Sequence, residues 1–169
     1  MSQNVLVRLH QTYVLYRQLT FDALNGLEES ELSRSWPRPG LDTFAKHLAE
    51  MAAVEGVFVE ALTSGRVDFS SVPDVFEFEN VSKDTLRSAL KEADTRLENA
   101  VNGSTAKGVS WGEGELLTIE QHFASIIAHE VFHQGMMAMA FYFLRLPLPE
   151  SWVVNWAMPQ VEPSSEVVG

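Results

Sequence analysis

Four segments of the chain place apolar side chains at alternating spacings of three and four residues, which is the repeat of an amphipathic α-helix. They cover residues 4–24, 42–64, 82–101 and 117–146. A glycine or a proline follows each segment closely, and both residue types end helices. No stretch between the segments alternates convincingly as a strand does. The sequence therefore predicts an all-α fold, a four-helix bundle formed by residues 1–169 as one domain.

The connections after the second and third predicted helices are long. We expect residues 66–80 to form an ordered loop, and residues 102–116, which are rich in glycine, to form another loop. Beyond the last helix, Trp152 and Trp156 are expected to pack back on the bundle. Residues 163–169 are expected to fray at the end of the chain.

Composition and charge limit the possible partners. The 169 residues are enough to bury a core, and 46% of them are apolar, which argues against disorder. With 12 basic and 23 acidic residues the formal net charge is −11, and such a surface disfavours nucleic acids and anionic membranes. No apolar run approaches the roughly 20 residues of a membrane span, and the first residues do not resemble a secretory signal. The chain has no cysteine, which excludes disulfides and thiolate ligands and fits a cytoplasmic location.

Two histidines on the last predicted helix have the spacing of metal ligands. His129 and His133 are four residues apart, so their side chains lie one turn apart with about 6 Å between the Cβ atoms. Two imidazoles placed in this way can bind one ion with bonds of about 2.1 Å. His47, on the inward row of the second predicted helix, is the candidate third ligand. Three neutral nitrogens leave coordination positions open for water or substrate, as in a catalytic site.

A less specific explanation also exists, because an H-x-x-x-H pair occurs on helices by chance. The metal site is favoured because His47, His129 and His133 all lie on predicted inward faces, where an imidazole needs polar partners. His122 points the same way as His129, but the helical rise separates their Cα atoms by about 10 Å, so one ion cannot readily bind both. We interpret His122 as a polar wall of the same cavity, behind the ligands, or as a core histidine with satisfied hydrogen bonds. His10 is expected on the surface or flank of its helix.

Residues 129–133 also match the H-E-x-x-H signature of zinc proteases, in which the glutamate is the general base. The extended form of that signature needs a downstream glycine and histidine, and Met136 and Met139 occupy those places. Glu130 remains a candidate catalytic residue that could orient a metal-bound water. The alternative is a carboxylate on the flank of the helix. A metalloprotease is therefore the least favoured of the enzymatic functions.

The sequence resembles the DinB-like superfamily of metal-binding four-helix bundles over nearly its whole length. Three segments carry the resemblance, namely residues 41–50 (LDTFAKHLAE), 129–135 (HEVFHQG) and 141–149 (FYFLRLPLP). The resemblance implies a three-histidine site for zinc, nickel or a similar divalent ion at His47, His129 and His133. It also implies, in many members, a homodimer.

Known activities of that superfamily imply the chemistry to expect. They include thiol transfer with bacillithiol or glutathione, mycothiol-dependent maleylpyruvate isomerisation and proposed metal-dependent hydrolysis. We therefore expect a metal-dependent hydrolase or thiol S-transferase for a small molecule, with a low-molecular-weight thiol as a candidate cofactor. The family often continues after its last histidine as Arg-Gly-Gln, whereas Gln134-Gly135-Met136 follows here, and the missing cation weakens the case for an anionic thiol. The alternatives are a non-catalytic metal-dependent binding or stress-response module and a structural bundle without metal.

The last predicted helix is apolar nearly all round, so several of its sides must be covered. Either the C-terminal tail or a second copy of the chain could cover the apolar surface of this helix that the other three helices leave exposed. The family resemblance favours a two-fold homodimer, which uses the same patch on both subunits.

Overall fold

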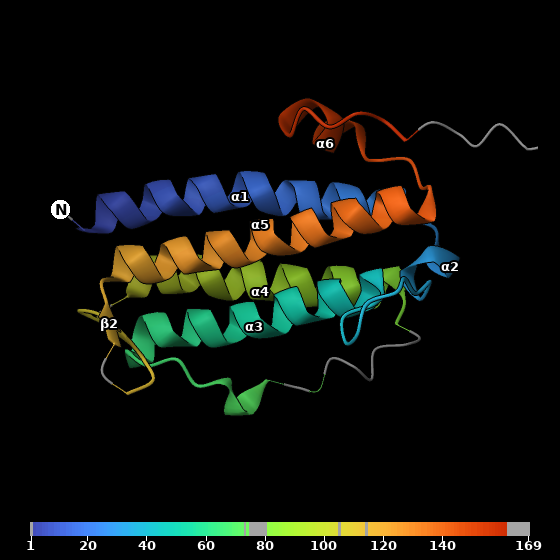
Figure 1. The fold of residues 1–169 in the computed structure, drawn as a ribbon. Coiled ribbons are helices and arrows are strands. Elements are labelled where there is room, and N and C mark those ends of the chain that lie inside the picture. The colour runs from blue at the N-terminus through green and yellow to red at the C-terminus, as the bar shows by residue number, and fades with distance from the viewer. Residues whose placement is uncertain (1, 73, 75–80, 105, 114, 162–169) are drawn as a thin grey trace, which may run out of the picture.

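The computed structural model describes residues 2–72, 74, 81–104, 106–113 and 115–161 (Figure 1). Four long helices run side by side and form a bundle: α1 (Ser2–Gly26), α3 (Phe44–Ser64), α4 (Lys83–Gly103) and α5 (Ile119–Leu144). The predicted all-α four-helix bundle is confirmed. The tail at residues 163–169, expected to fray, lies outside the described residues.

Side-chain caps explain where three of the long helices begin. Thr43, Ser82 and Thr118 accept hydrogen bonds from backbone amides in the first turns of α3, α4 and α5. Thr118 forms a full capping box with Gln121, whose side chain accepts from the Thr118 amide. The cap of α3 is thus one residue after the expected Asp42, whose carboxylate instead pairs with Lys46 at 2.8 Å.

The ends of α3 and α5 adopt left-handed backbone conformations. Gly65 follows α3 at φ 76°, where a glycine avoids the steric cost of a side chain. Arg145 follows α5 at φ 56°, so this helix ends at Leu144, two residues before the expected end at residue 146 and ahead of the prolines that were expected to stop it.

Short elements fill the connections. They are α2 (Glu29–Leu32), the 3-10 helix η1 (Phe69–Ser71), the strands β1 (Val109–Trp111) and β2 (Glu115–Leu117), and α6 (Glu150–Asn155). The two strands pair antiparallel, with Val109 opposite Leu117. Most of this hairpin lies in the region that was expected to be a loop, but Leu117, which was expected to begin the last helix, belongs to β2. Strands of three residues are too short to show an alternating pattern, so periodicity could not reveal this hairpin.

Each long helix packs against two others. Helix α1 contacts α4 and α5, and α3 also contacts α4 and α5, so the four form a closed ring. Helical spacing predicts an inward row on α3 and an apolar stripe on α4, and both are buried throughout: His47, Met51, Val54, Phe58 and Leu62 on α3, and Leu86, Leu90, Ala93, Leu97 and Ala100 on α4. On α5, the same spacing places Phe143 on the inward row with the histidines, but 59% of Phe143 is exposed. Apolar core clusters occupy both ends of the bundle, and buried polar side chains lie between them.

Helix α6 lies outside the ring, over α1 and α5 (Figure 1). Trp152 is fully buried, and its indole Nε1 donates to the Leu19 carbonyl at 2.8 Å. Trp156 stacks on Tyr16 with 5.6 Å between the ring centroids. The expected packing of both tryptophans on the bundle is therefore observed. Separately, among the described helices there is none whose length and apolarity would allow it to cross a membrane.

Candidate metal centre

Two histidines of α5 and a glutamate of α3 converge where these helices face each other. One candidate ligand atom from each of Glu50, His129 and His133 lies within 4.8 Å of the other two. His133 Nε2 is 2.5 Å from Glu50 Oε2 and 3.1 Å from His129 Nε2, and His129 Nε2 is 3.6 Å from Glu50 Oε2. We call these three residues the donor cluster. The sequence spacing accounts for the histidine pair, and the packing of α3 against α5 supplies the carboxylate.

The donor cluster is buried on one side and open on the other. The His133 side chain is 2% exposed, whereas those of His129 and Glu50 are 19% and 22% exposed. A water or small molecule can therefore approach from the side of His129 and Glu50. Burial opposes ionisation of Glu50, but its contacts with His129 and His133 outweigh burial and hold the pKa of the carboxyl below its usual range.

His47 lies against the far side of His133. Its Nδ1 is 2.8 Å from His133 Nδ1, and its ring stacks on Trp36 with 5.5 Å between centroids. The ring is fully buried, and this burial, together with the charges of His133 and Arg38, lowers the pKa of His47 to about 3. His47 is thus neutral at physiological pH and keeps a lone pair for a metal or a hydrogen bond.

The residues present fit a divalent metal ion. Two imidazole nitrogens and a carboxylate oxygen suit a borderline ion such as Zn²⁺. Glu50 Oε2 is buried, and its close contact with His133 lacks hydrogen-bond geometry, so within the described residues this oxygen has no hydrogen-bond donor. A cation would satisfy it. One ion can bind only one nitrogen of His133, and Nε2 faces Glu50 and His129 while Nδ1 faces His47.

The predicted three-histidine set is therefore brought together in part. His129 and His133 meet in the donor cluster, and His47 contacts His133 through its other nitrogen. Glu50 Oε2 lies beside both His129 and His133, so Glu50 is a second candidate for the third ligand besides His47. The two possible donor sets share His129 and His133 and differ only in the third residue, which is His47 in one and Glu50 in the other.

His122 is not part of the donor cluster and is separated from it by the Phe58 ring. Its Nδ1 accepts a hydrogen bond from Trp111 Nε1 at 3.0 Å, and its Nε2 is 2.8 Å from the Phe58 carbonyl. The Phe58 ring separates it from His129, with centroid distances of 5.6 Å to His122 and 5.7 Å to His129. Both nitrogens are engaged, which is what a core histidine with satisfied hydrogen bonds requires.

Glu130 points to the opposite side of α5. Its carboxylate accepts a hydrogen bond from Thr20 and lies 3.2 Å from Arg17 Nη1, and both partners belong to α1. The structure does not bring this carboxylate to the histidines, although it is adjacent to His129 in sequence. His10 is half-buried on α1 beside α4, on the flank expected for it.

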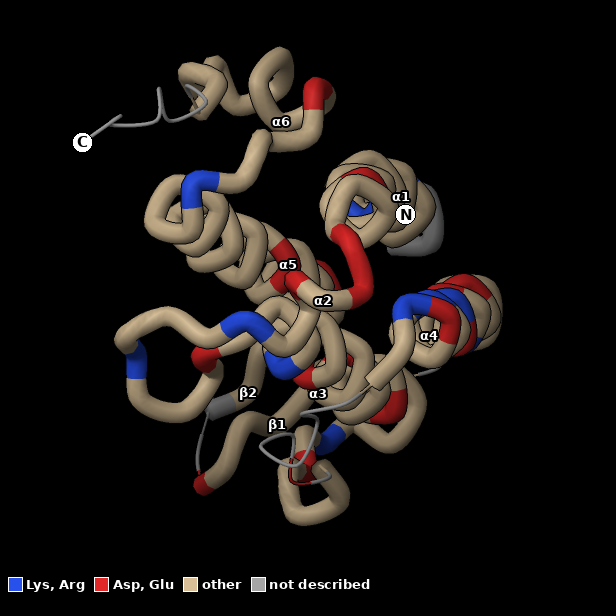
Figure 2. Tube along the Cα trace, turned by 90° about the vertical axis from the view of Figure 1, so that its right-hand side faces the viewer, with Lys and Arg blue, Asp and Glu red and all other residues tan. Residues whose placement is uncertain are grey.

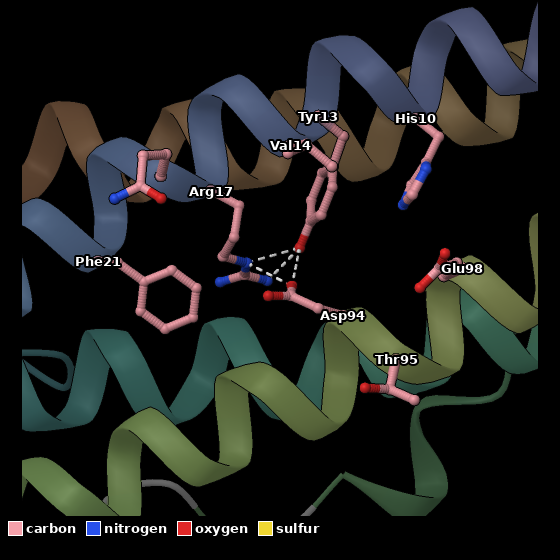
Figure 3. Close-up of a pocket in the computed structure, with 9 residues that line it drawn as sticks. His10, Tyr13, Val14, Arg17, Phe21, Asp94, Thr95 and Glu98 are labelled. Atoms are coloured by element: carbon pink, nitrogen blue, oxygen red, sulfur yellow. Dashed lines mark hydrogen bonds and ion pairs between the residues drawn. The ribbon is translucent and has the colours of Figure 1, made fainter.

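A second polar cluster ties all four long helices together. Arg17 and Tyr13 of α1 meet Glu55 of α3, Asp94 of α4 and Glu130 of α5, and we call these residues the charge cluster. Arg17 Nε is 2.9 Å from Asp94 Oδ1, and Tyr13 donates to the same oxygen at 3.2 Å. Figure 3 shows these three side chains turned toward one another, and they line part of a cavity of about 200 Å³ between α1 and α4.

Two residues beside the candidate centre do not stand out in the sequence. Glu50 follows His47 by three residues, so helical spacing could have marked it as sharing a face with that histidine. Arg38 lies in the Pro-rich segment before α3, and its Nη1 is 3.1 Å from His47 Nε2. No periodicity marks a residue in such a turn, so only the tertiary structure reveals it.

Comparison with known proteins identifies the family of the fold. A family model of the DinB superfamily matches residues 12–137. The match begins in α1 and ends in α5, so it includes both helices that carry the donor cluster. No curated protein matches the chain.

Proposed function

Since the chain belongs to the DinB superfamily and brings two histidines and a glutamate together, we propose that it is a metal-dependent enzyme acting on a small molecule. The single observation that supports this most directly is the donor cluster, with its buried, unsatisfied carboxylate oxygen. His129 and His133 would bind one divalent ion, Zn²⁺ or Ni²⁺, together with a third donor from α3.

The proposed reaction is hydrolysis or the transfer of a thiol. A divalent ion in such a site lowers the pKa of a bound water or thiol and so supplies a nucleophile at neutral pH. The side chains around the ion would control which molecules reach it. The buried side, at His133 and His47, excludes water, and the exposed edges of His129 and Glu50 leave room for a substrate. The thiol cofactor itself remains a proposal taken from the family resemblance.

Elemental analysis of protein purified without a histidine tag tests the metal site. We expect about one divalent ion per chain in the wild type. His129→Ala and His133→Ala should each lose most of it, because each removes a nitrogen that both possible donor sets need. His10→Ala, which removes a histidine of α1 that lies beside α4, is the matched control and should keep its metal.

Equal metal content in the wild type and both histidine variants would exclude the site. If the metal is bound but neither thiols nor esters are turned over by the loaded protein, a non-catalytic binding module replaces the enzyme.

A further inference from the structure

A cavity of about 200 Å³ lies between α5 and the C-terminal segment, and it shares no lining residue with the donor cluster. Gly135 and Met139 line it from α5, and Trp152, Trp156 and Met158 line it from the C-terminal segment. Protein interiors seldom leave a gap larger than a water molecule. Because Gly135 and Met139 are exposed, a molecule can reach this gap from outside.

The C-terminal segment is fastened beside α5 by contacts that leave the cavity open. The Tyr142 hydroxyl donates to the Pro159 carbonyl at 2.7 Å. The Gln160 side chain accepts from the Leu148 amide at 2.8 Å and donates to the Leu148 carbonyl at 3.1 Å. The stacking of Trp156 on α1 adds a further contact. The cavity is therefore formed before any ligand binds.

Gly135 leaves space on the α5 side of the cavity. It lies inside a helix of 26 residues, where glycine is less favourable than alanine. A Cβ atom at this position would meet nothing within 4 Å, so no close contact within the described part of the chain requires a glycine here. The chain thus keeps room at this position that it does not itself use.

The chemistry of the lining favours an uncharged aromatic ligand. None of the described residues that line the cavity carries a charge, so a charged ligand would lose hydration without gaining a partner. Gln134 also lines it, but its amide nitrogen is used by the Tyr16 carbonyl at 2.7 Å and the Thr20 hydroxyl at 3.0 Å. Indole rings and thioether sulfurs make favourable contacts with aromatic rings.

The size of the cavity limits the ligand to one ring with a small substituent. An apolar cavity of about 150 Å³ can hold benzene, whereas a helix of a partner protein is roughly 10 Å across and would not enter. We infer that this cavity is a binding site for a small, neutral, aromatic molecule. The site is separate from the candidate metal centre and does not depend on it.

Fluorobenzene, titrated into the full chain and followed by fluorine NMR, tests the inference. We expect saturable binding to the wild type. The cation para-fluorobenzylammonium carries the same ring with a charged substituent, and we expect it to bind about tenfold more weakly or not at all. Equal affinity for the two probes would overturn the assignment of a neutral ligand.

Two variants locate the binding in this cavity. Gly135→Leu should fold, because its Cβ meets no other atom, and should lower the affinity for fluorobenzene about tenfold by taking up space beside the cavity. Trp156→Ala removes one aromatic wall and should also weaken binding. Gly103→Leu, at an exposed glycine of α4 whose Cβ would likewise meet nothing, is the matched control and should bind as the wild type does.

Three results would overturn the site. The first is a wild type that shows no saturable binding of fluorobenzene. The second is an affinity that is the same in the wild type, Gly135→Leu and Trp156→Ala. The third is a fall in the mass of the protein by light scattering when fluorobenzene is added, because a side chain of a second copy would then be the natural occupant.

Discussion

At the scale of single residues, His47 and Glu50 are the two candidates for the third donor. His47 is neutral at physiological pH because its pKa is near 3, so one of its two ring nitrogens carries a lone pair. Replacing it with alanine removes that nitrogen, whereas Glu50→Gln keeps an oxygen donor and loses only the charge. We expect His47→Ala to weaken Zn²⁺ binding about 100-fold and Glu50→Gln about tenfold, the range found when metal sites lose a supporting group.

Competition with a chromophoric chelator measures both affinities under the same conditions. The opposite ranking would assign the third position to Glu50 and leave His47 as the residue that orients His133 through Nδ1.

His122 gives a second prediction at this scale. His122→Ala would leave two buried polar groups, Trp111 Nε1 and the Phe58 carbonyl, without their hydrogen-bond partner. We expect a loss of about 2 kcal/mol in the free energy of unfolding, measured by denaturant titration, with the metal content unchanged. A loss of metal as large as that of His133→Ala would show that His122 is a ligand after all.

At the scale of elements, the charge cluster holds α1 against the other three helices. Three carboxylates surround the single guanidinium of Arg17, so the buried cluster carries more negative than positive charge if all are ionised. Burial is the largest effect on Glu55 and, despite the opposing charge of Arg17, raises its pKa to about 7. Burial also raises the pKa of Asp94. The folded protein therefore holds a proton on Glu55 that the unfolded chain releases.

The sign of the pH effect follows from this shift. Between the unfolded pKa of Glu55, near 4.5, and its folded pKa, near 7, the native state binds more protons than the unfolded state, so the contribution of Glu55 to stability falls as the pH rises. Glu55→Gln mimics the protonated form and has no such dependence. Relative to the wild type, this variant should gain stability from pH 5 to pH 8, by up to about 3 kcal/mol at roughly 1.4 kcal/mol per pKa unit.

Unfolding of both proteins by denaturant across this pH range measures the difference and cancels the titration of all other groups. Glu60→Gln, an exposed glutamate on the same helix, is the control. A stability difference that does not change with pH would show that Glu55 is ionised in the folded protein.

At the scale of the whole molecule, the outer face of α5 lacks charge. Figure 2 shows charged positions spread along α4 and few along α5. The exposed α5 positions carry uncharged side chains, namely Gln121, Ala124, Ala128, Phe132, Gly135, Met139 and Phe143. Helix α6 covers one flank of α5 but leaves Phe132, Met139 and Phe143 more than half exposed. We propose that a second copy of the chain covers this face in a two-fold dimer.

Light scattering at micromolar concentration should give twice the 18.9 kDa mass of the chain. Met139→Asp should shift the protein toward the monomer, because a charge would have to be buried in the interface. Leu15→Asp changes a side chain of similar exposure on α1 and should leave the dimer intact. A wild type with the mass of one chain would overturn the proposed dimer and show that α6 alone provides the cover that α5 needs.

The sequence by itself determined the four long helices and the pairing of His129 with His133. Helical periodicity fixes which residues share a face, and a spacing of four residues brings two side chains of one helix together whatever surrounds them. For the same reason the buried rows of α3 and α4 were predictable residue by residue. The family followed from short segments around these histidines, and the match over residues 12–137 confirmed it.

Only the tertiary structure decided what these faces meet. The rotation of α3 against α5 puts Glu50 on the open side of His133 and His47 on the other, and periodicity within one helix carries no information about rotation between two. The same packing turns Glu130 toward Arg17, away from the histidines that flank it in sequence. Arg38 reaches the site through a turn, where no repeat exists to be read. Contacts between elements depend on how whole surfaces pack, and that is a property of the assembled bundle.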